Sequence, residues 1–123
     1  MGKILVVEDN PTNMILAVYI LESAGHHVLQ AENAAIGIQL ARREQPDLIF
    51  MDIQLPDMDG LEAARQLKSE PAMHKIPVYA LTAFAMKGDK ERIGSSGCDG
   101  YLSKPISHKD LLSVVDRVLA KGH

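Results

Sequence analysis

The sequence predicts a single α/β domain in which a parallel sheet of five strands is covered on both faces by five helices. Short, wholly apolar runs alternate along the chain with segments of helical length. Continuous apolar strands joined by helices are typical of parallel sheets that are buried on both faces. The length of 123 residues corresponds to one domain, and no repeat, low-complexity tract or linker divides it.

Boundary signals define the first two β-α units. A compact run rich in branched side chains comes first, and Asn10-Pro11 then begins a helix, because Asn is a favoured N-cap and Pro suits the first turn. Gly25 ends this helix, and Asn33 caps the next one, which ends before Pro46. The expected elements are a strand at 4–7, a helix at 11–24, a strand at 28–31 and a helix at 33–43.

The remaining three units follow the same alternation. A wholly apolar strand leads directly to Asp52, and Pro71 stops the third helix. Ser107 with Asp110 resembles a capping box for the last helix, whose apolar residues repeat with helical spacing. The expected elements are strands at 48–51, 76–81 and 101–102, helices at 60–69 and 86–96, and a final helix after Ser107.

Composition excludes several classes of protein. The net charge of −3 and the pI near 5.9 argue against general nucleic-acid binding. The apolar runs have strand length, well short of the ~20 residues that a membrane span needs. Cys98 is the single cysteine and cannot form an internal disulfide, which fits a reducing compartment. We therefore expect a cytoplasmic protein.

The residues that follow the strands carry the functional signal. In open parallel sheets, ligands bind at the carboxyl ends of the strands. The chain places Glu8-Asp9, Asp52, Thr82 and Lys104 at these ends. Three carboxylates would repel one another, and Mg²⁺ relieves such repulsion while also bridging to a phosphate oxygen. A carboxylate nucleophile, a metal, a hydroxyl and a lysine are the groups needed to form an aspartyl phosphate.

These residues lie in segments that resemble the receiver domains of two-component response regulators over essentially the whole chain. The matching segments are ILVVEDN, DLIFMDIQLPDMDG, ALTA and YLSKP. The resemblance implies a flavodoxin-like doubly wound sheet with strand order 2-1-3-4-5, and a protein that accepts a phosphoryl group and signals by changing shape. It implies a phosphoacceptor that assists its own phosphorylation and dephosphorylation, and is not otherwise an enzyme.

The resemblance also implies a role for each site residue. Asp52 would be the phosphoacceptor, and Mg²⁺, for which Mn²⁺ can substitute, would be bound by Asp52, Glu8, Asp9 and the backbone carbonyl of Gln54. Glu8 stands where many relatives carry Asp, which should adjust the metal geometry without abolishing binding.

Further residues carry the predicted switch. Thr82 would hydrogen-bond the phosphoryl group, and Tyr101 would follow it inward. Lys104 would pair with a phosphoryl oxygen, with a cis bond to Pro105. Phe84 would tune the loss of the phosphoryl group.

Two segments resemble a narrower group. AFAMKGDKERI and SKPIS resemble DivK-like single-domain regulators, and also receivers attached to hybrid histidine kinases. We expect residues 1–123 to form one receiver domain without an output domain. A receiver that belongs to a larger hybrid kinase is the alternative.

Two helices are expected to contact partners. The first helix carries one apolar stripe for the core, which includes Leu16, and a second stripe formed by Met14, Ile15, Val18 and Tyr19. We expect the second stripe to bind a histidine kinase or a His-phosphotransfer protein. The fourth helix contains several glycines that disfavour it. We therefore place a downstream protein target on helix four, strand five and helix five.

Other functions fit the sequence less well. A haloacid-dehalogenase-like phosphatase needs a second aspartate two residues after the nucleophile, where this chain has Gln54. A flavin binder needs a phosphate-binding loop after the first strand, where Glu8-Asp9 would repel phosphate. A phosphate-independent adaptor would not need the acidic constellation at all.

Overall fold

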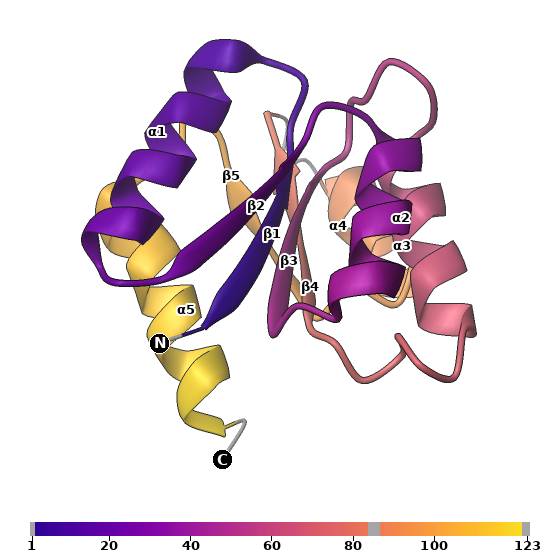
Figure 1. Cartoon of the computed structure of the whole chain (residues 1–123). Helices are drawn as coiled ribbons and strands as arrows, with labels where there is room; N and C mark the ends of the chain where they lie inside the picture. The colour runs from indigo at the N-terminus through magenta and orange to yellow at the C-terminus, as the bar shows by residue number, and fades with distance from the viewer. Residues whose placement is uncertain (1, 84–86, 122–123) are drawn as a thin grey trace.

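The structure is a computed structural model that describes residues 2–83 and 87–121, and it contains one parallel sheet (Figure 1). The strand order is β2-β1-β3-β4-β5, which confirms the predicted order. The strands are β1 Lys3–Val7, β2 His27–Ala31, β3 Leu48–Asp52, β4 Val78–Thr82 and β5 Gly100–Ser103. The helices are α1 Pro11–Ser23, α2 Ala34–Glu44, α3 Gly60–Ser69, α4 Lys87–Ser95 and α5 His108–Lys121.

The sheet separates two apolar cores. Figure 1 shows α1 and α5 together on one face of the sheet and α2, α3 and α4 on the other. Alternate residues of β1 divide between the two cores, with Ile4 and Val6 on the α1 side and Leu5 and Val7 on the α2 side. This alternation follows from the two-residue repeat of a strand, and it explains why the central strands are apolar throughout.

The expected caps are present at the first two helices. Asn10 Oδ1 accepts hydrogen bonds from the backbone N–H groups of Thr12 and Asn13, at 2.9 and 3.1 Å. Asn33 Oδ1 accepts a hydrogen bond from Ile36 N at 2.9 Å. Both caps lie just beyond the carboxyl ends of β1 and β2, so they fix where the chain leaves the functional edge of the sheet.

Most expected boundaries agree with the structure to within one residue, and the start of the fourth strand differs by two. The fourth strand begins at Val78 instead of Ile76, because Pro77 has no N–H to donate to the neighbouring strand. Its carbonyl still accepts a hydrogen bond from Ile49 N at 2.9 Å. The expected start of the fourth helix at Met86, and the tuning residue Phe84, lie outside the described residues.

The exposed stripe of α1 differs from the prediction. Met14 is only 8% exposed and belongs to the core, and Val18 packs against that core, so neither forms part of an exposed stripe. Leu16, expected in the core, is 38% exposed beside Ile15 and Tyr19 at 69% and 68%. The reason is the helical repeat, because the core side is set by Ala17, Ile20 and Leu21, which turns Met14 inward and Leu16 outward.

Candidate functional site

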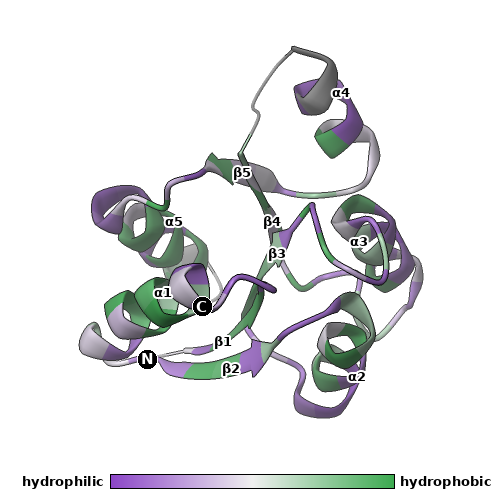
Figure 2. Cartoon of the chain, turned by 90° about the horizontal axis from the view of Figure 1, so that it is seen from above, coloured by the Kyte–Doolittle hydropathy of each residue, from purple (hydrophilic) through white to green (hydrophobic). Residues whose placement is uncertain are grey.

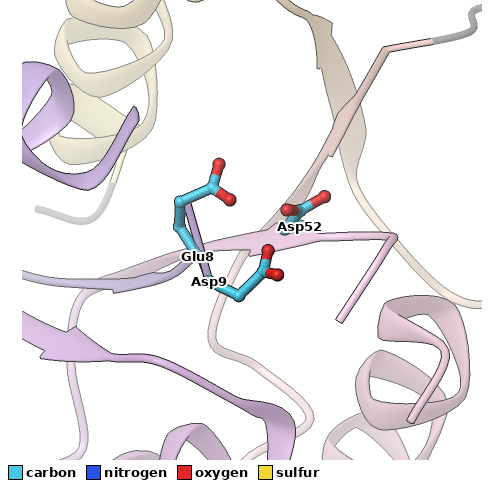
Figure 3. Close-up of side chains that lie close together, drawn as sticks. All are labelled: Glu8, Asp9 and Asp52. Atoms are coloured by element: carbon cyan, nitrogen blue, oxygen red, sulfur yellow. The ribbon is translucent and has the colours of Figure 1, made fainter. Parts of the chain in front are cut away.

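Three acidic side chains meet at the carboxyl edge of the sheet, as Figure 3 shows. Glu8 and Asp9 directly follow β1, and Asp52 is the last residue of β3. These strands are neighbours in the sheet, with Val7 opposite Met51. One carboxylate oxygen from each of the three residues lies within 4.8 Å of the others. The predicted acidic cluster is therefore formed by strand pairing, although its members are far apart in the sequence.

Lys104 adds a positive charge to this cluster at the same edge of the sheet. It follows β5, and its Nζ lies 2.8 Å from Glu8 Oε1 and 2.9 Å from Asp52 Oδ2. Its backbone N–H donates a hydrogen bond of 2.7 Å to the carbonyl of Thr82, the last residue of β4. The Lys104–Pro105 peptide is cis, as expected. The ends of four strands thus supply the predicted residues to one site.

The cluster combines deep burial with charge. Glu8 and Asp52 are 2% and 3% exposed, whereas Asp9 is exposed. Burial, and then the neighbouring Asp52, raises the pKa of Glu8 above its ordinary value, and Lys104 opposes this only in part. Burial alone would lower the pKa of Lys104, but its contacts with Glu8 and Asp52 outweigh that effect and raise it. The site therefore holds a protonated lysine between two crowded carboxylates.

Glu8 Oε1 forms an ion pair but lacks a directed hydrogen bond. It lies within ion-pair distance of Lys104 Nζ, yet among the described residues no donor meets it in hydrogen-bond geometry. We regard the contact as electrostatic, because a nitrogen at 2.8 Å attracts an anion whatever its direction. A buried carboxylate oxygen without a directed donor is costly, and a cation can satisfy it.

The loop after Asp52 orients the acceptor carboxylate. Gln54 N donates a hydrogen bond of 3.0 Å to Asp52 Oδ1, which leaves Oδ2 to Lys104. Gln54 also forms an antiparallel bridge with Asp59, and Gly60 N donates to the carbonyl of Ile53 at 2.8 Å. The loop thus folds back on itself beside the acceptor, which places the Gln54 backbone next to the site.

Sequence reasoning missed the role of Gly60 as a packing site. A Cβ on Gly60 would lie 1.9 Å from the carbonyl oxygen of Asp52, so only glycine permits this close approach. The signal in the sequence is the glycine at the start of the helix expected at 60–69, a position that does not by itself require glycine.

Tyr101, the predicted switch partner, lies in β5 opposite Ala80 and is half-buried. It packs against the small cluster of Leu61, Ala80 and Ile93, which links α3, β4 and α4. Tyr101 therefore lies on the α4 side of the sheet.

The donor set suits a hard divalent cation. All three side chains offer carboxylate oxygens, the ligands that Mg²⁺ and Mn²⁺ prefer. One lysine cannot neutralise three carboxylates, so the cluster keeps an excess of negative charge. The residues present therefore fit a magnesium site of two buried carboxylates and one exposed carboxylate.

The comparison with known families decides what this site is. The profile of the response regulator receiver domain matches residues 4–116, nearly the whole chain. The chain belongs to this family. A receiver domain is a phosphoacceptor of two-component signalling and not a conventional enzyme, and its partner is a histidine kinase. The acidic cluster of this receiver is typical of the family's magnesium site.

Individual relatives agree with this assignment. The receiver is 49% identical over 105 residues to the polar-differentiation response regulator DivK of Brucella anthropi, which covers 85% of each chain. It matches the receiver domain of a sensor histidine kinase of Pseudomonas aeruginosa with a TM-score of 0.90 and 34% identity, over 97% of this chain and 98% of that one. That structure carries a magnesium ion in its active-site cleft.

A third relative was solved with a different metal ion bound. The Mn²⁺-bound form of response regulator Rcp1 matches with a TM-score of 0.79 and 26% identity, over 96% of this chain and 91% of that one. Among the described residues of this receiver, no helix has the length and apolar character needed to cross a membrane.

Proposed function

We propose that this receiver accepts a phosphoryl group on Asp52 from a histidine kinase or a His-phosphotransfer protein, in a reaction that depends on Mg²⁺. The observation that carries the proposal is the position of Asp52. It is buried at the end of β3, beside Glu8 and Asp9, and its Oδ2 lies 2.9 Å from Lys104 Nζ. Both oxygens of Asp52 accept hydrogen bonds, from Gln54 N and from Lys104 Nζ. Glu8 also has a backbone donor, Asn10 N, but its contact with Lys104 is an ion pair without hydrogen-bond geometry.

The chemistry follows from this orientation. A carboxylate oxygen of Asp52 attacks the phosphorus of a phosphohistidine, the new P–O bond forms, and the P–N bond breaks with its electron pair leaving on the imidazole. The ammonium of Lys104 lies beside the attacking carboxylate, where it can balance negative charge on the transferred group. Lys104 is then placed to pair with an oxygen of the bound phosphoryl group.

Glu8, Asp9, Asp52 and the backbone carbonyl of Gln54 would hold the metal ion. When bound, Mg²⁺ supplies positive charge to the oxygens of the phosphoryl group during transfer. Glu8 and Asp52 share the single charge of Lys104, and a bound cation would balance the negative charge that the lysine leaves over. The magnesium and manganese ions named in the two solved relatives support this choice of cation.

The switch runs from the site toward α4. Thr82 ends β4 next to the cluster and would hydrogen-bond the phosphoryl group, and Tyr101 in β5 would move with it. Because Tyr101 packs on the same cluster as Ile93 of α4, its movement would change how α4 is held. A downstream protein would then read the surface of α4, β5 and α5.

The phosphodonor would dock on α1. Ile15, Leu16 and Tyr19 form an exposed apolar patch on the helix that begins directly after the acidic residues. A helical partner docked there would bring its phosphohistidine to the same edge of the sheet as Asp52. The DivK-like identity favours a regulator that acts through protein partners, and a receiver domain of a hybrid kinase is the alternative.

Localising the phosphoryl group tests this function. The protein would be treated with acetyl phosphate and Mg²⁺, reduced with borohydride to trap the acyl phosphate, and digested for tandem mass spectrometry. We expect the modified residue to be Asp52. Modification at another carboxylate would contradict the assignment of Asp52. An unmodified chain that still binds partners would instead support the phosphate-independent adaptor.

A further inference from the structure

An ion pair joins α4 to the loop that follows Asp52. Arg92 Nη2 donates a hydrogen bond of 2.7 Å to Asp59 Oδ2. Arg92 lies near the C-terminal end of α4, whereas Asp59 is the N-cap of α3, 33 residues earlier in the chain. Sequence reasoning treated neither residue as functional.

Asp59 also contacts the start of α3 and the phosphoacceptor loop, which is the segment between Asp52 and Gly60. Its Oδ1 accepts a hydrogen bond from Leu61 N at 2.8 Å, which starts α3. Its backbone forms an antiparallel bridge with Gln54, whose N–H in turn donates to Asp52 Oδ1. A continuous path of direct contacts therefore leads from Arg92 through Asp59 and Gln54 to the acceptor carboxylate.

The loop is packed too tightly to absorb a shift at Asp59. Gly60 N donates to the carbonyl of Ile53 at 2.8 Å, and the Gly60 backbone lies against the carbonyl of Asp52, with no room for a Cβ. Close-packed groups of this kind move together. A displacement of Asp59 is therefore transmitted to the backbone around Asp52.

At the other end of the path, α4 is weakly held. It carries glycines at positions 88 and 94, which disfavour a helix, and its Ile93 packs on Leu61 and Ala80. Figure 2 shows α4 at the β5 edge of the sheet, on the same side of the sheet as α3. A helix that its own glycines disfavour depends more on each polar contact that it makes.

We propose that the Arg92–Asp59 ion pair couples the position of α4 to the geometry of the phosphoacceptor loop, which makes Arg92 a positioning residue for the Asp52 site. The inference rests on the proposed function. By reciprocity, a protein that displaces Arg92 when it binds α4 changes the affinity of the site for Mg²⁺, and metal binding changes the affinity for that protein.

The size of the coupling is bounded by the exposure of the pair. The side chains of Arg92 and Asp59 are 56% and 44% exposed, so water screens their attraction. Exposed pairs of this kind change an equilibrium by at most about fivefold. The ion pair can therefore tune the site without determining whether the domain folds.

A double-mutant cycle tests the coupling with Arg92→Gln, Asp59→Asn and the combined variant. Asn remains a good N-cap, so α3 should still begin at Gly60. Two quantities are measured: Mg²⁺ affinity by calorimetry, and amide exchange of Gly60 and of residues 87–95 in the metal-free protein. We expect each variant to weaken Mg²⁺ binding by about two- to fivefold and to speed both exchange processes, with the double variant no worse than either single one.

Two further variants separate coupling from a general loss of charge. Arg65→Gln removes another arginine near Asp59, but Arg65 pairs with Glu62 within α3, so both readouts should stay at the wild-type value. Arg92→Lys keeps the charge and should recover part of the effect. Additive single variants, or exchange at Gly60 that is unchanged in Arg92→Gln, would overturn the proposal.

The two proposals fail in different ways. A wild-type protein that binds no Mg²⁺ and takes no phosphoryl group contradicts the proposed function, while the metal-free exchange data still decide the coupling. Normal phosphorylation of Asp52 combined with additive variants contradicts the coupling alone.

Discussion

At the scale of single residues, Lys104 balances the charge of the site. Its ammonium lies within 2.9 Å of oxygens on both Glu8 and Asp52. Buried charges are tolerated only when they are paired, and this lysine pairs two carboxylates at once. The same position makes it a competitor for the metal, because both cations are attracted to the same oxygens.

Lys104→Met separates these two roles. Removing the competing charge should tighten Mg²⁺ binding, by up to about tenfold if the change is worth about 1.4 kcal/mol. Phosphorylation by acetyl phosphate should nevertheless become slower, because the variant loses the group that pairs with the phosphoryl oxygen. Calorimetry and intact mass spectrometry measure the two effects. Weaker Mg²⁺ binding in the variant would contradict this account of the lysine.

The residues at the strand ends could be predicted from the sequence, but the ion pair between Arg92 and Asp59 could not. Glu8, Asp52, Thr82 and Lys104 each follow an apolar run, and parallel strands bring such positions to one edge, so sequence alone indicated their proximity. The Arg92–Asp59 pair could not be found this way, because it depends on the relative placement of two helices. No local pattern in the sequence encodes that placement.

At the scale of elements, two glycines show how tightly each helix is held. A Cβ on Gly60 at the start of α3 would collide with the backbone of Asp52, whereas a Cβ on Gly94 in α4 would meet no described atom within 4 Å outside the adjoining turns of its own helix. The phosphoacceptor side of α3 is therefore rigidly packed, and the corresponding part of α4 is open.

Alanine substitutions at these glycines should have opposite effects. Gly60→Ala should lower the free energy of unfolding by roughly 1–3 kcal/mol or more, because the backbone must move to avoid a clash. Gly94→Ala should raise it by up to about 1 kcal/mol, since alanine favours the helix. Urea denaturation measures both, and hydrogen exchange should show α4 less protected than α1 in the wild type. Equal protection of the two helices would contradict a weakly held α4.

The loop between Asp52 and α3 also contacts the start of α2. The carboxylate of Asp57 accepts hydrogen bonds from Ala34 N at 2.9 Å and from Ala35 N at 3.0 Å. These bonds lower the pKa of Asp57 below its ordinary value of 3.8. Because the unfolded chain takes up this proton first, the stabilisation is full above about pH 4 and is lost as pH falls through the lower folded pKa.

Asp57→Asn should therefore flatten the loss of stability in acid. The wild type should lose stability more steeply than the variant below about pH 4, as measured by thermal unfolding over a series of pH values. Above that pH the variant should be the less stable of the two, because a neutral amide replaces a charged acceptor. Parallel curves for the two proteins would show that Asp57 does not contribute through its charge.

In α1, the spacing of the apolar residues was not enough to predict which side of the helix faces the core. α1 is apolar around most of its circumference, so spacing alone did not decide which side faces the core. Ala17 and Leu21 were correctly placed, but Met14 and Leu16 exchanged roles once the helix packed on β1 and α5. A helix with a polar face leaves no such ambiguity.

At the scale of the whole molecule, the site lies between two candidate surfaces. The exposed patch of Ile15, Leu16 and Tyr19 lies on one face of the sheet, and α4 lies on the other (Figure 1). The acidic cluster occupies the edge between them. This arrangement lets a donor approach from one side while a target protein reads the other.

Replacing the patch should separate docking from chemistry. In Ile15→Ser with Tyr19→Ser, phosphorylation by acetyl phosphate should match the wild type, and stability should change by only about 0.5 kcal/mol per site, since both side chains are exposed. Transfer from a phosphorylated histidine protein that serves the wild type should slow at least about tenfold, the equivalent of about 1.4 kcal/mol of docking energy. Ile36→Ser, an exposed apolar residue of α2, is the matched control. Unchanged transfer would remove α1 as the docking surface.

The central claim is that Asp52 accepts a phosphoryl group with the help of Mg²⁺. The most direct measurement is the intact mass of wild type and Asp52→Asn after incubation with acetyl phosphate, each with and without Mg²⁺. The account predicts a single phosphoryl adduct on the wild type only when Mg²⁺ is present, and none on the variant. A folded wild-type protein that gains no adduct with Mg²⁺, or an equal adduct on Asp52→Asn, would contradict it.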